Sequence, residues 1–273
     1  MTDLYAVFGN PLGHSKSPLI HSHFAEQTGQ DLQYIAIESP LDGFAADVEA
    51  FRARGGKGIN ITAPFKLEAF ALATELRQHA ELAGASNALK FEDDKIIAEN
   101  FDGVGLVRDI QYNLSVPLRG RRVLLLGAGG AARGTALPIL ESEPALLTIV
   151  NRTVSKAHAL REMFSSFGKV ASCGYAELRP GSFDVVINAT SVSWSGQLLP
   201  ITESVFAETV LAYDLVYGKG LTPFLRMAKL GGVDRLADGV GMLVEQAAEA
   251  FEWWRGVRPM TAPTIARITI PLN

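Results

Sequence analysis

The feature that most constrains this chain is a short apolar run that breaks into a glycine-rich turn within residues 121–133. The run 123–126 predicts a buried strand, and the alanine-rich segment after the glycines predicts a helix. Gly127 permits the tight turn, and Gly129 lets the backbone approach a pyrophosphate closely, with the helix N–H groups facing its charge. Ala132 stands where a last glycine is usual, and a plain strand with a glycine turn is the alternative. The layout therefore predicts the opening of a dinucleotide-binding fold.

The composition is that of a globular protein. The chain has 273 residues, a net charge of −4 at pH 7 and 48% hydrophobic residues, which allows one large domain or two smaller ones. The mild acidity, without a basic stripe, argues against nucleic-acid binding, and no histidine, cysteine or carboxylate spacing indicates a metal site. No apolar stretch reaches the roughly 18–20 residues of a membrane span. Because the N-terminal residues lack the features of a signal peptide, we expect a cytoplasmic protein.

Strands and helices are expected to alternate along the chain. Alternation of this kind predicts right-handed βαβ crossovers and a parallel sheet with helices on both faces. The expected strands are 4–9, 32–37, 57–62, 88–91, 96–98, 123–126, 146–150, 183–188 and 211–214, with 88–98 forming a hairpin. The expected helices, apart from the one after the glycine turn, are 17–27, 41–54, 68–81, 104–113, 155–164, 223–229 and 241–254.

The residues after the second strand of the later half indicate the cofactor. In dinucleotide-binding folds an acidic residue there accepts from the ribose 2′-hydroxyl of NAD and repels a 2′-phosphate. This chain instead has Asn151, Arg152 and Thr153, with Lys156 one helical turn further on. A guanidinium, an ammonium and a hydroxyl can converge on one phosphate, whereas cations at a helix start are otherwise disfavoured. We therefore expect NADP rather than NAD.

A nicotinamide enzyme also needs a proton donor beside the carbonyl that it reduces. Lys66 follows a strand end that carries Asn60 and Thr62, and Asp102 lies in the turn before the helix at 104–113. A lysine beside an aspartate, partly shielded from water, makes a workable proton-transfer pair. Taken singly, each residue is more often a solvated lysine or a turn aspartate. The two are candidates because they occur together.

Short motifs along the whole chain resemble those of the shikimate dehydrogenases, in matching order and spacing. The resemblance implies an NADP-dependent oxidoreductase of aromatic amino acid biosynthesis that reversibly reduces 3-dehydroshikimate to shikimate. The motifs are Gly-His-Ser-Lys-Ser-Pro at 13–18, Asn-x-Thr-x-Pro-Phe-Lys at 60–66, Gly-Ala-x-Asn at 84–87, Asn-x-Asp-Gly at 100–103, Gly-Ala-Gly-Gly-Ala at 127–131, Asn-Arg-Thr at 151–153, Asn-Ala-Thr-Ser at 188–191, Tyr-Gly-Lys-Gly-x-Thr-Pro at 217–223 and Asp-Gly-x-Gly-Met-Leu-x-x-Gln-Ala at 238–247.

The same resemblance implies a role for each matched residue. Lys66 would be the acid/base residue, with Asp102 paired to it. The small-molecule substrate would be bound by Ser15, Ser17, Asn60, Thr62, Asn87, Tyr217 and Gln246. NADP would be bound by Gly127, Ala128, Gly129, Gly130, Ala131, Asn151, Arg152, Thr153, Lys156, Thr190, Leu215, Gly239 and Met242.

Together these expectations predict an α/β fold of two domains with a cleft between them. An N-terminal α/β substrate-binding domain would span residues 1–103, completed by a C-terminal helical segment at 241–273. A Rossmann-type, parallel-sheet NADP-binding domain would span residues 104–240. The oligomeric state does not follow from the sequence, and a homodimer stays open.

The chain departs from the family pattern beside Asp102. Phe101 stands where most relatives have threonine, and Ala88 where threonine is usual after Asn87. One interpretation is compensated packing, in which the larger Phe101 and the smaller Ala88 exchange volume within one core. Another is a pocket reshaped for quinate or an amino analogue. A third is a ligand sensor without the chemistry, against which the intact Lys66 and Asp102 speak.

Overall fold

The computed structural model describes residues 2–272, apart from the side chains of Trp194 and Ser195, and it divides the chain into two compact units. Unit 1 comprises Met1–Gly105 and Val244–Ala266, and unit 2 comprises Leu106–Leu243 and Arg267–Asn273. The terminal residues of the expected domains, Met1 and Asn273, lie outside the described part. No helix within residues 2–272 is long and apolar enough to cross a membrane.

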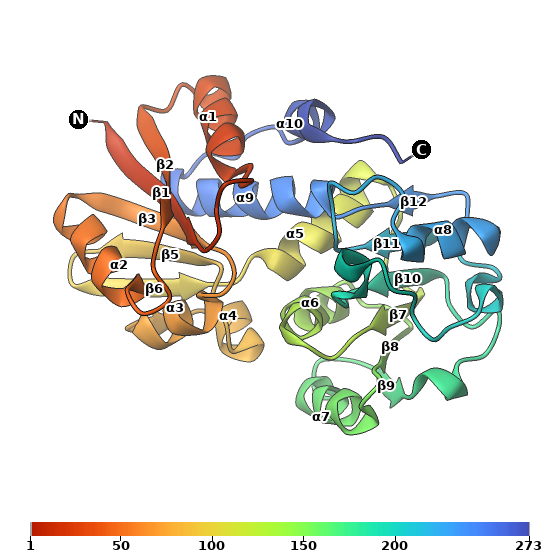
Figure 1. Cartoon of the computed structure of the whole chain (residues 1–273). Helices are drawn as coiled ribbons and strands as arrows, with labels where there is room; N and C mark the ends of the chain where they lie inside the picture. Colours follow the sequence, from red (N-terminus) through yellow and green to blue (C-terminus); the bar gives the residue numbers. More distant parts are fainter. Residues whose placement is uncertain (1, 273) are drawn as a thin grey trace. The chain divides into compact units, whose positions relative to one another are not determined.

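Unit 1 is built on a mixed six-stranded sheet with the order β2-β1-β3-β5-β6-β4 (Figure 1). β1 pairs in parallel with β2 and β3, whereas β5 runs antiparallel to β3 and β6, so the hairpin expected at 88–98 is confirmed. The strands are β1 (Asp3–Gly9), β2 (Leu32–Glu38), β3 (Gly56–Ile61), β4 (Glu75–Leu76), β5 (Ala88–Glu92) and β6 (Lys95–Glu99).

Helices cover the apolar residues of this sheet. Phe8 lies fully buried between Phe44 and Phe51, with both ring pairs edge-on. Phe251, from the far end of the chain, packs edge-on against Phe24 and completes the unit. The helices are α1 (Ser17–Thr28), α2 (Phe44–Ala53), α3 (Lys66–Leu72), α4 (Gln78–Ala83), the later part of α9 (Val240–Arg255) and most of α10 (Ala262–Ile268).

The single helix expected at 68–81 is wrong. α3 ends at Leu72, and the chain then forms the short strand β4 before α4 begins at Gln78. Thr74 explains the break, because its N–H and hydroxyl both donate to the carbonyl of Ile96, at 2.8 and 3.2 Å. Its hydroxyl also accepts the N–H of Ile96 at 2.9 Å. These bonds tie the segment to β6 and outweigh its helical tendency.

Unit 2 is built on a six-stranded sheet with the order β12-β11-β10-β7-β8-β9, in which every pairing is parallel (Figure 1). The predicted parallel-sheet, Rossmann-type fold is therefore confirmed. The short outer strands β9 and β12 were not expected. The strands are β7 (Arg122–Leu126), β8 (Leu146–Val150), β9 (Val170–Cys173), β10 (Val185–Asn188), β11 (Leu211–Asp214) and β12 (Leu236–Ala237).

The helices of unit 2 follow the strands as βαβ connections require. α7 packs against β8 and β9, and α8 packs against β11 and β12. The helix expected at 104–113 is two elements, α5 (Asp102–Arg108) and a π-helical turn at Asp109–Asn113. The remaining helices are α6 (Gly130–Glu141), α7 (Val154–Phe164), α8 (Pro223–Leu230) and the short 3₁₀ helices Tyr175–Glu177, Val192–Ser195 and Glu203–Phe206.

Candidate active site

Lys66 and Asp102 form an ion pair among the polar residues of unit 1. Lys66 begins α3 and Asp102 begins α5, and Lys66 Nζ lies 2.6 Å from Asp102 Oδ2. The two side chains are 34% and 19% exposed, so the pair is shielded yet open to a ligand. An ammonium held in this way can give a proton to an oxygen atom that gains charge, and can take it back.

Asn87 connects this ion pair to other amide groups. Its Nδ2 donates to Asp102 Oδ1 at 2.8 Å and to Gln246 Oε1 at 3.2 Å. Its Oδ1 accepts the N–H of Phe101 at 2.9 Å. Because oxygen and nitrogen of the amide are both engaged, the amide has one orientation, and it holds the carboxylate of Asp102 in place.

Tyr34 is a member of this network that the sequence did not reveal. Its buried hydroxyl donates to Asn60 Oδ1 at 2.7 Å, and Asn60 Nδ2 donates to the carbonyl of Asn87 at 3.4 Å. Burial raises the pKa of Tyr34 well above its ordinary value, and a hydrogen bond with Ser17 opposes that rise. Tyr34 therefore links Ser17, at the start of α1, to Asn60 in β3. No local pattern could have found it, because its partners lie far away in the sequence.

Ser15 and Thr62, the other expected residues of unit 1, each lie two positions in the sequence from a member of this network, Ser17 and Asn60. The hydroxyl of Ser15 accepts the N–H of Ser17 at 3.4 Å, and the half-buried Thr62 lies just past the end of β3. Six of the seven expected substrate residues thus belong to unit 1, and Tyr217 belongs to unit 2.

Phe101 points into a hydrophobic cluster and not into the polar network. It is 6% exposed and packs with Ala88, Ala250 and Trp253, whose ring meets it edge-on at 5.6 Å between centroids. The small Ala88 and the large Phe101 thus fill the same cluster. This arrangement supports compensated packing over a reshaped pocket.

The glycine turn of unit 2 lies at the carboxyl end of β7. Gly127 has φ +116°, and a Cβ there would lie 3.2 Å from the carbonyl oxygen of Ala189 and from Thr190 Cγ2, so only glycine fits. Gly129 and Gly130 are exposed at the start of the twelve-residue helix α6, with open space around them and no side-chain cap. The N–H groups of this helix start are free to bind a pyrophosphate.

A second candidate anion site lies at the start of α7. Arg152, Thr153 and Lys156 are exposed there, and the first turn of α7 carries no acidic residue. Asn151 Nδ2 donates to the carbonyl of Thr153 at 3.0 Å and closes the turn. Two cations and a hydroxyl at a helix start fit a phosphate group, so the donor set suits the 2′-phosphate of NADP.

The loops after β10 and β11 are held by the buried carboxylate of Asp214. It accepts from the hydroxyls of Ser193 and Thr222, each at 2.6 Å, and from Asn188 Nδ2 at 3.0 Å. Asn188 Oδ1 in turn accepts the N–H and the hydroxyl of Thr190. Burial raises the pKa of Asp214, while these hydrogen bonds lower it. The network fixes the loop that carries Thr190.

The last expected cofactor residues gather where β11 and β12 end. Gly239 lies against the carbonyl of Leu215, where a Cβ would have no room. Met242 is half-buried in the first turn of α9. The segments after β11 and after β12 both lie at the carboxyl edge of the sheet, where open α/β sheets bind ligands.

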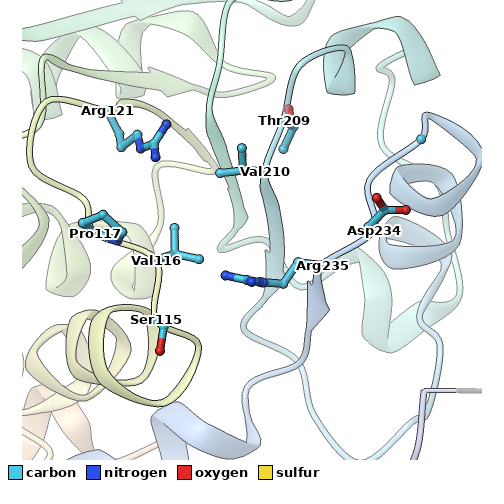
Figure 2. A pocket seen from close by; sticks show the side chains of 9 residues that line it. Ser115, Val116, Pro117, Arg121, Thr209, Val210, Asp234 and Arg235 are labelled. Atoms are coloured by element: carbon cyan, nitrogen blue, oxygen red, sulfur yellow. The ribbon is translucent and has the colours of Figure 1, made fainter.

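A separate pocket of about 370 Å³ lies at the amino edge of the same sheet. Figure 2 shows the side chains of Arg121, Val210 and Arg235 around it. These three residues directly precede β7, β11 and β12. Because ligands of such sheets bind at the carboxyl ends of the strands, we do not assign this pocket to the cofactor. Within the described residues, no group of three or more histidines, cysteines or carboxylates could hold a metal ion.

Family models match most of the chain. The shikimate dehydrogenase substrate binding domain matches residues 7–89, the shikimate/quinate 5-dehydrogenase model matches 110–196, and the shikimate 5′-dehydrogenase C-terminal domain matches 239–267. A shikimate dehydrogenase (NADP(+)) from Nitrosospira multiformis is 58% identical, with 100% of this chain and 99% of the relative covered.

Solved structures show the same similarity. An Ael1 enzyme from Pseudomonas putida is 59% identical with a TM-score of 0.97, over 99% of this chain and 100% of the other. Shikimate 5-dehydrogenase from Thermus thermophilus, in complex with NADP(H) and shikimate, is 30% identical with a TM-score of 0.86, over 97% of each chain.

Proposed function

The chain belongs to the shikimate dehydrogenase family, and from that premise we propose that Lys66 and Asp102 carry out its chemistry. The enzyme is an NADP-dependent oxidoreductase that reduces 3-dehydroshikimate reversibly to shikimate, in aromatic amino acid biosynthesis. The observation that carries the residue assignment is the 2.6 Å ion pair, whose carboxylate is held by Asn87.

Lys66 is the proton donor in this proposal. NADPH, when bound, supplies the hydride that reduces the carbonyl carbon. The Lys66 ammonium gives its proton to the carbonyl oxygen as negative charge develops there, and the amine takes the proton back when shikimate is oxidised. Asp102 holds the ammonium and accepts a hydrogen bond from the neighbouring ring hydroxyl.

Neutral groups hold the ring acid. Hydroxyls and amides can bind a polyhydroxylated ring without adding charge, which leaves the Lys66 ammonium for the developing alkoxide. In this proposal the carboxylate of the substrate is bound by Ser15 and Ser17 with help from Tyr217. Thr62, Asn87 and Gln246 bind ring hydroxyls or carboxylate, and Asn60 belongs to the same set.

The cofactor-binding residues belong to unit 2. The pyrophosphate lies on Gly127, Ala128, Gly129, Gly130 and Ala131, where the exposed helix start supports the assignment. The 2′-phosphate is bound by Arg152, Thr153 and Lys156, in the turn that Asn151 closes. Thr190, Leu215, Gly239 and Met242 line the path from adenine to nicotinamide.

Steady-state kinetics with shikimate and quinate, each against NADP and NAD, test this function. We expect shikimate with NADP to give the highest kcat/KM. A higher kcat/KM with quinate or an amino analogue would support the altered-substrate alternative, and binding without turnover would support the ligand sensor. We further propose a cytoplasmic location. Light scattering of the purified protein would decide whether it is a monomer or a homodimer.

A further inference from the structure

Two buried residues that the proposed chemistry does not use hold the first turn of α9. Tyr213, fully buried in β11, donates its hydroxyl proton to Asp109 Oδ2 at 2.7 Å. The same hydroxyl oxygen accepts the N–H of Met242 at 3.2 Å. The carboxylate of Asp109 also occupies the position that a Cβ on Gly241 would take. Asp109 can therefore lie against the backbone of α9 only because residue 241 is glycine.

Asp109 owes its position to the π-helical turn that follows α5. The turn begins at Asp109, which is 3% exposed, and Asp109 Oδ1 accepts from Asn113 Nδ2 at 2.9 Å. π-Helical turns are rare in proteins, and those that do occur are often found at functional sites. Burial, then the charge of Asp109, raises the pKa of Tyr213 well above its ordinary value. The hydroxyl therefore keeps its proton and remains a donor to the carboxylate.

The bond to Met242 satisfies a helix start. The first N–H groups of an α-helix have no partner within the helix. In α9, Asp238 Oδ1 accepts the N–H of Val240 at 3.2 Å, and the first bond back along the helix runs from Leu243 to Gly239 at 2.9 Å. The N–H of Met242 lies between these two positions and is taken up by Tyr213. The turn that carries Gly239 and Met242 is thus fixed at both ends.

We propose that Tyr213, held by Asp109, is a positioning residue that fixes the turn at Gly239–Met242 for binding of NADP. The inference rests on the proposed function, which assigns Gly239 and Met242 to the cofactor. Tyr213 acts through the backbone of Met242, so its loss weakens cofactor binding and leaves the residues of unit 1 unchanged.

The variant Tyr213→Phe removes the hydroxyl and keeps the ring. We expect the Kd for NADPH, measured by fluorescence, to rise roughly three- to tenfold, which is the value of one hydrogen bond. The Kd for shikimate, measured by calorimetry on the cofactor-free protein, should stay within about twofold because its expected residues lie mostly in unit 1. A purely structural role would lower the Tm without this split between the two ligands. Tyr112→Phe, which removes an exposed hydroxyl from the same π-helical turn, is the matched control and should bind both ligands as the wild type does.

An unchanged Kd for NADPH in folded Tyr213→Phe, or an equal loss for both ligands, overturns the inference. Should Tyr213→Phe fail to fold, Asp109→Asn, which keeps an acceptor for the hydroxyl but removes its charge, is judged by the same split. A wild-type protein that neither binds NADPH nor oxidises shikimate would instead contradict the proposed function, so the two failures are distinguishable.

Discussion

Lys66 Nζ and Asp102 Oδ2 lie 2.6 Å apart although 36 residues separate them in the sequence. Each residue begins a helix, and Asn87 holds the second oxygen of the carboxylate. The pair is therefore arranged by three separate segments of the chain: the first residues of α3 and α5, and the residue before β5. A change at Lys66 removes the proton donor, whereas a change at Asn87 leaves the donor and loosens its partner.

Lys66→Ala tests the proton donor. We expect kcat for shikimate oxidation to fall roughly 10²- to 10⁴-fold, the usual contribution of a general acid or base, with a much smaller change in KM. The measurement is NADPH formation followed by absorbance. Lys57→Ala, which removes an exposed lysine from β3, is the control and should keep full activity. Full turnover by Lys66→Ala would remove the catalytic assignment.

Arg152→Ala tests the 2′-phosphate site. Loss of a charged hydrogen bond to phosphate should raise the KM for NADP roughly 10- to 100-fold and leave the KM for NAD unchanged. Arg161→Ala, in the last turn of the same helix, controls for the loss of a positive charge on α7. If both cofactors were affected equally, Arg152 would not be reading the phosphate.

Phe101→Thr tests the packing interpretation. Replacing a ring that is 6% exposed by a small side chain leaves a cavity beside Ala88 and should cost about 2–4 kcal/mol of unfolding free energy, measured with urea. The double variant with Ala88→Thr refills part of that space and should recover part of the loss. The ratio of kcat/KM for shikimate and quinate should not move. If the wild type favoured quinate over shikimate more strongly than Phe101→Thr does, the interpretation that Phe101 reshapes the pocket would be supported instead.

The buried His21 should make the protein less stable in acid. It is 1% exposed and stacks on Tyr34 with centroids 4.1 Å apart, and burial lowers its pKa from 6.5 to about 3. Below pH 6.5 the unfolded chain gains a proton that the folded chain does not take until about pH 3. The contribution of neutral His21 is therefore present above pH 6.5 and is lost as the pH falls through that window, by about 1.4 kcal/mol per pH unit.

The variant His21→Phe, which keeps a buried ring without the titrating nitrogens, should abolish this part of the pH dependence. The unfolding free energy of both proteins is measured by denaturant titration at about pH 7.5 and about pH 5, where the wild type should lose roughly 2 kcal/mol more than the variant. Parallel curves for wild type and His21→Phe would contradict the assignment.

The parallel sheet of unit 2 could be predicted because its strands are continuous apolar runs. Residues 123–126 are fully buried, as both faces of a parallel sheet require, and the glycine turn follows directly. β9 and β12 escaped prediction for the opposite reason. They are short, only partly buried and defined by pairing with β8 and β11, not by their own pattern.

Candidate site residues could be proposed from the sequence where the signal is local, and not where it depends on distant contacts. The cationic turn at Arg152 and the strand end at Asn60 can be recognised from a few neighbouring residues. Tyr34 and Tyr213 look like ordinary apolar strand residues, and only their long-range hydrogen bonds show what they hold. The break at Thr74 was missed in the same way, because its partner Ile96 lies in another strand.

The discontinuity of unit 1 sets an order for folding during synthesis. Its first 105 residues leave the ribosome before Phe251 and Trp254, on which Phe24 and Tyr5 pack, have been made. At typical rates of elongation the delay is on the order of ten seconds. Unit 2, by contrast, comprises nearly one continuous stretch and can fold while unit 1 still waits. Until α9 is made, Phe24 and Tyr5 of the nascent chain therefore lack the aromatic partners that cover them in the folded unit.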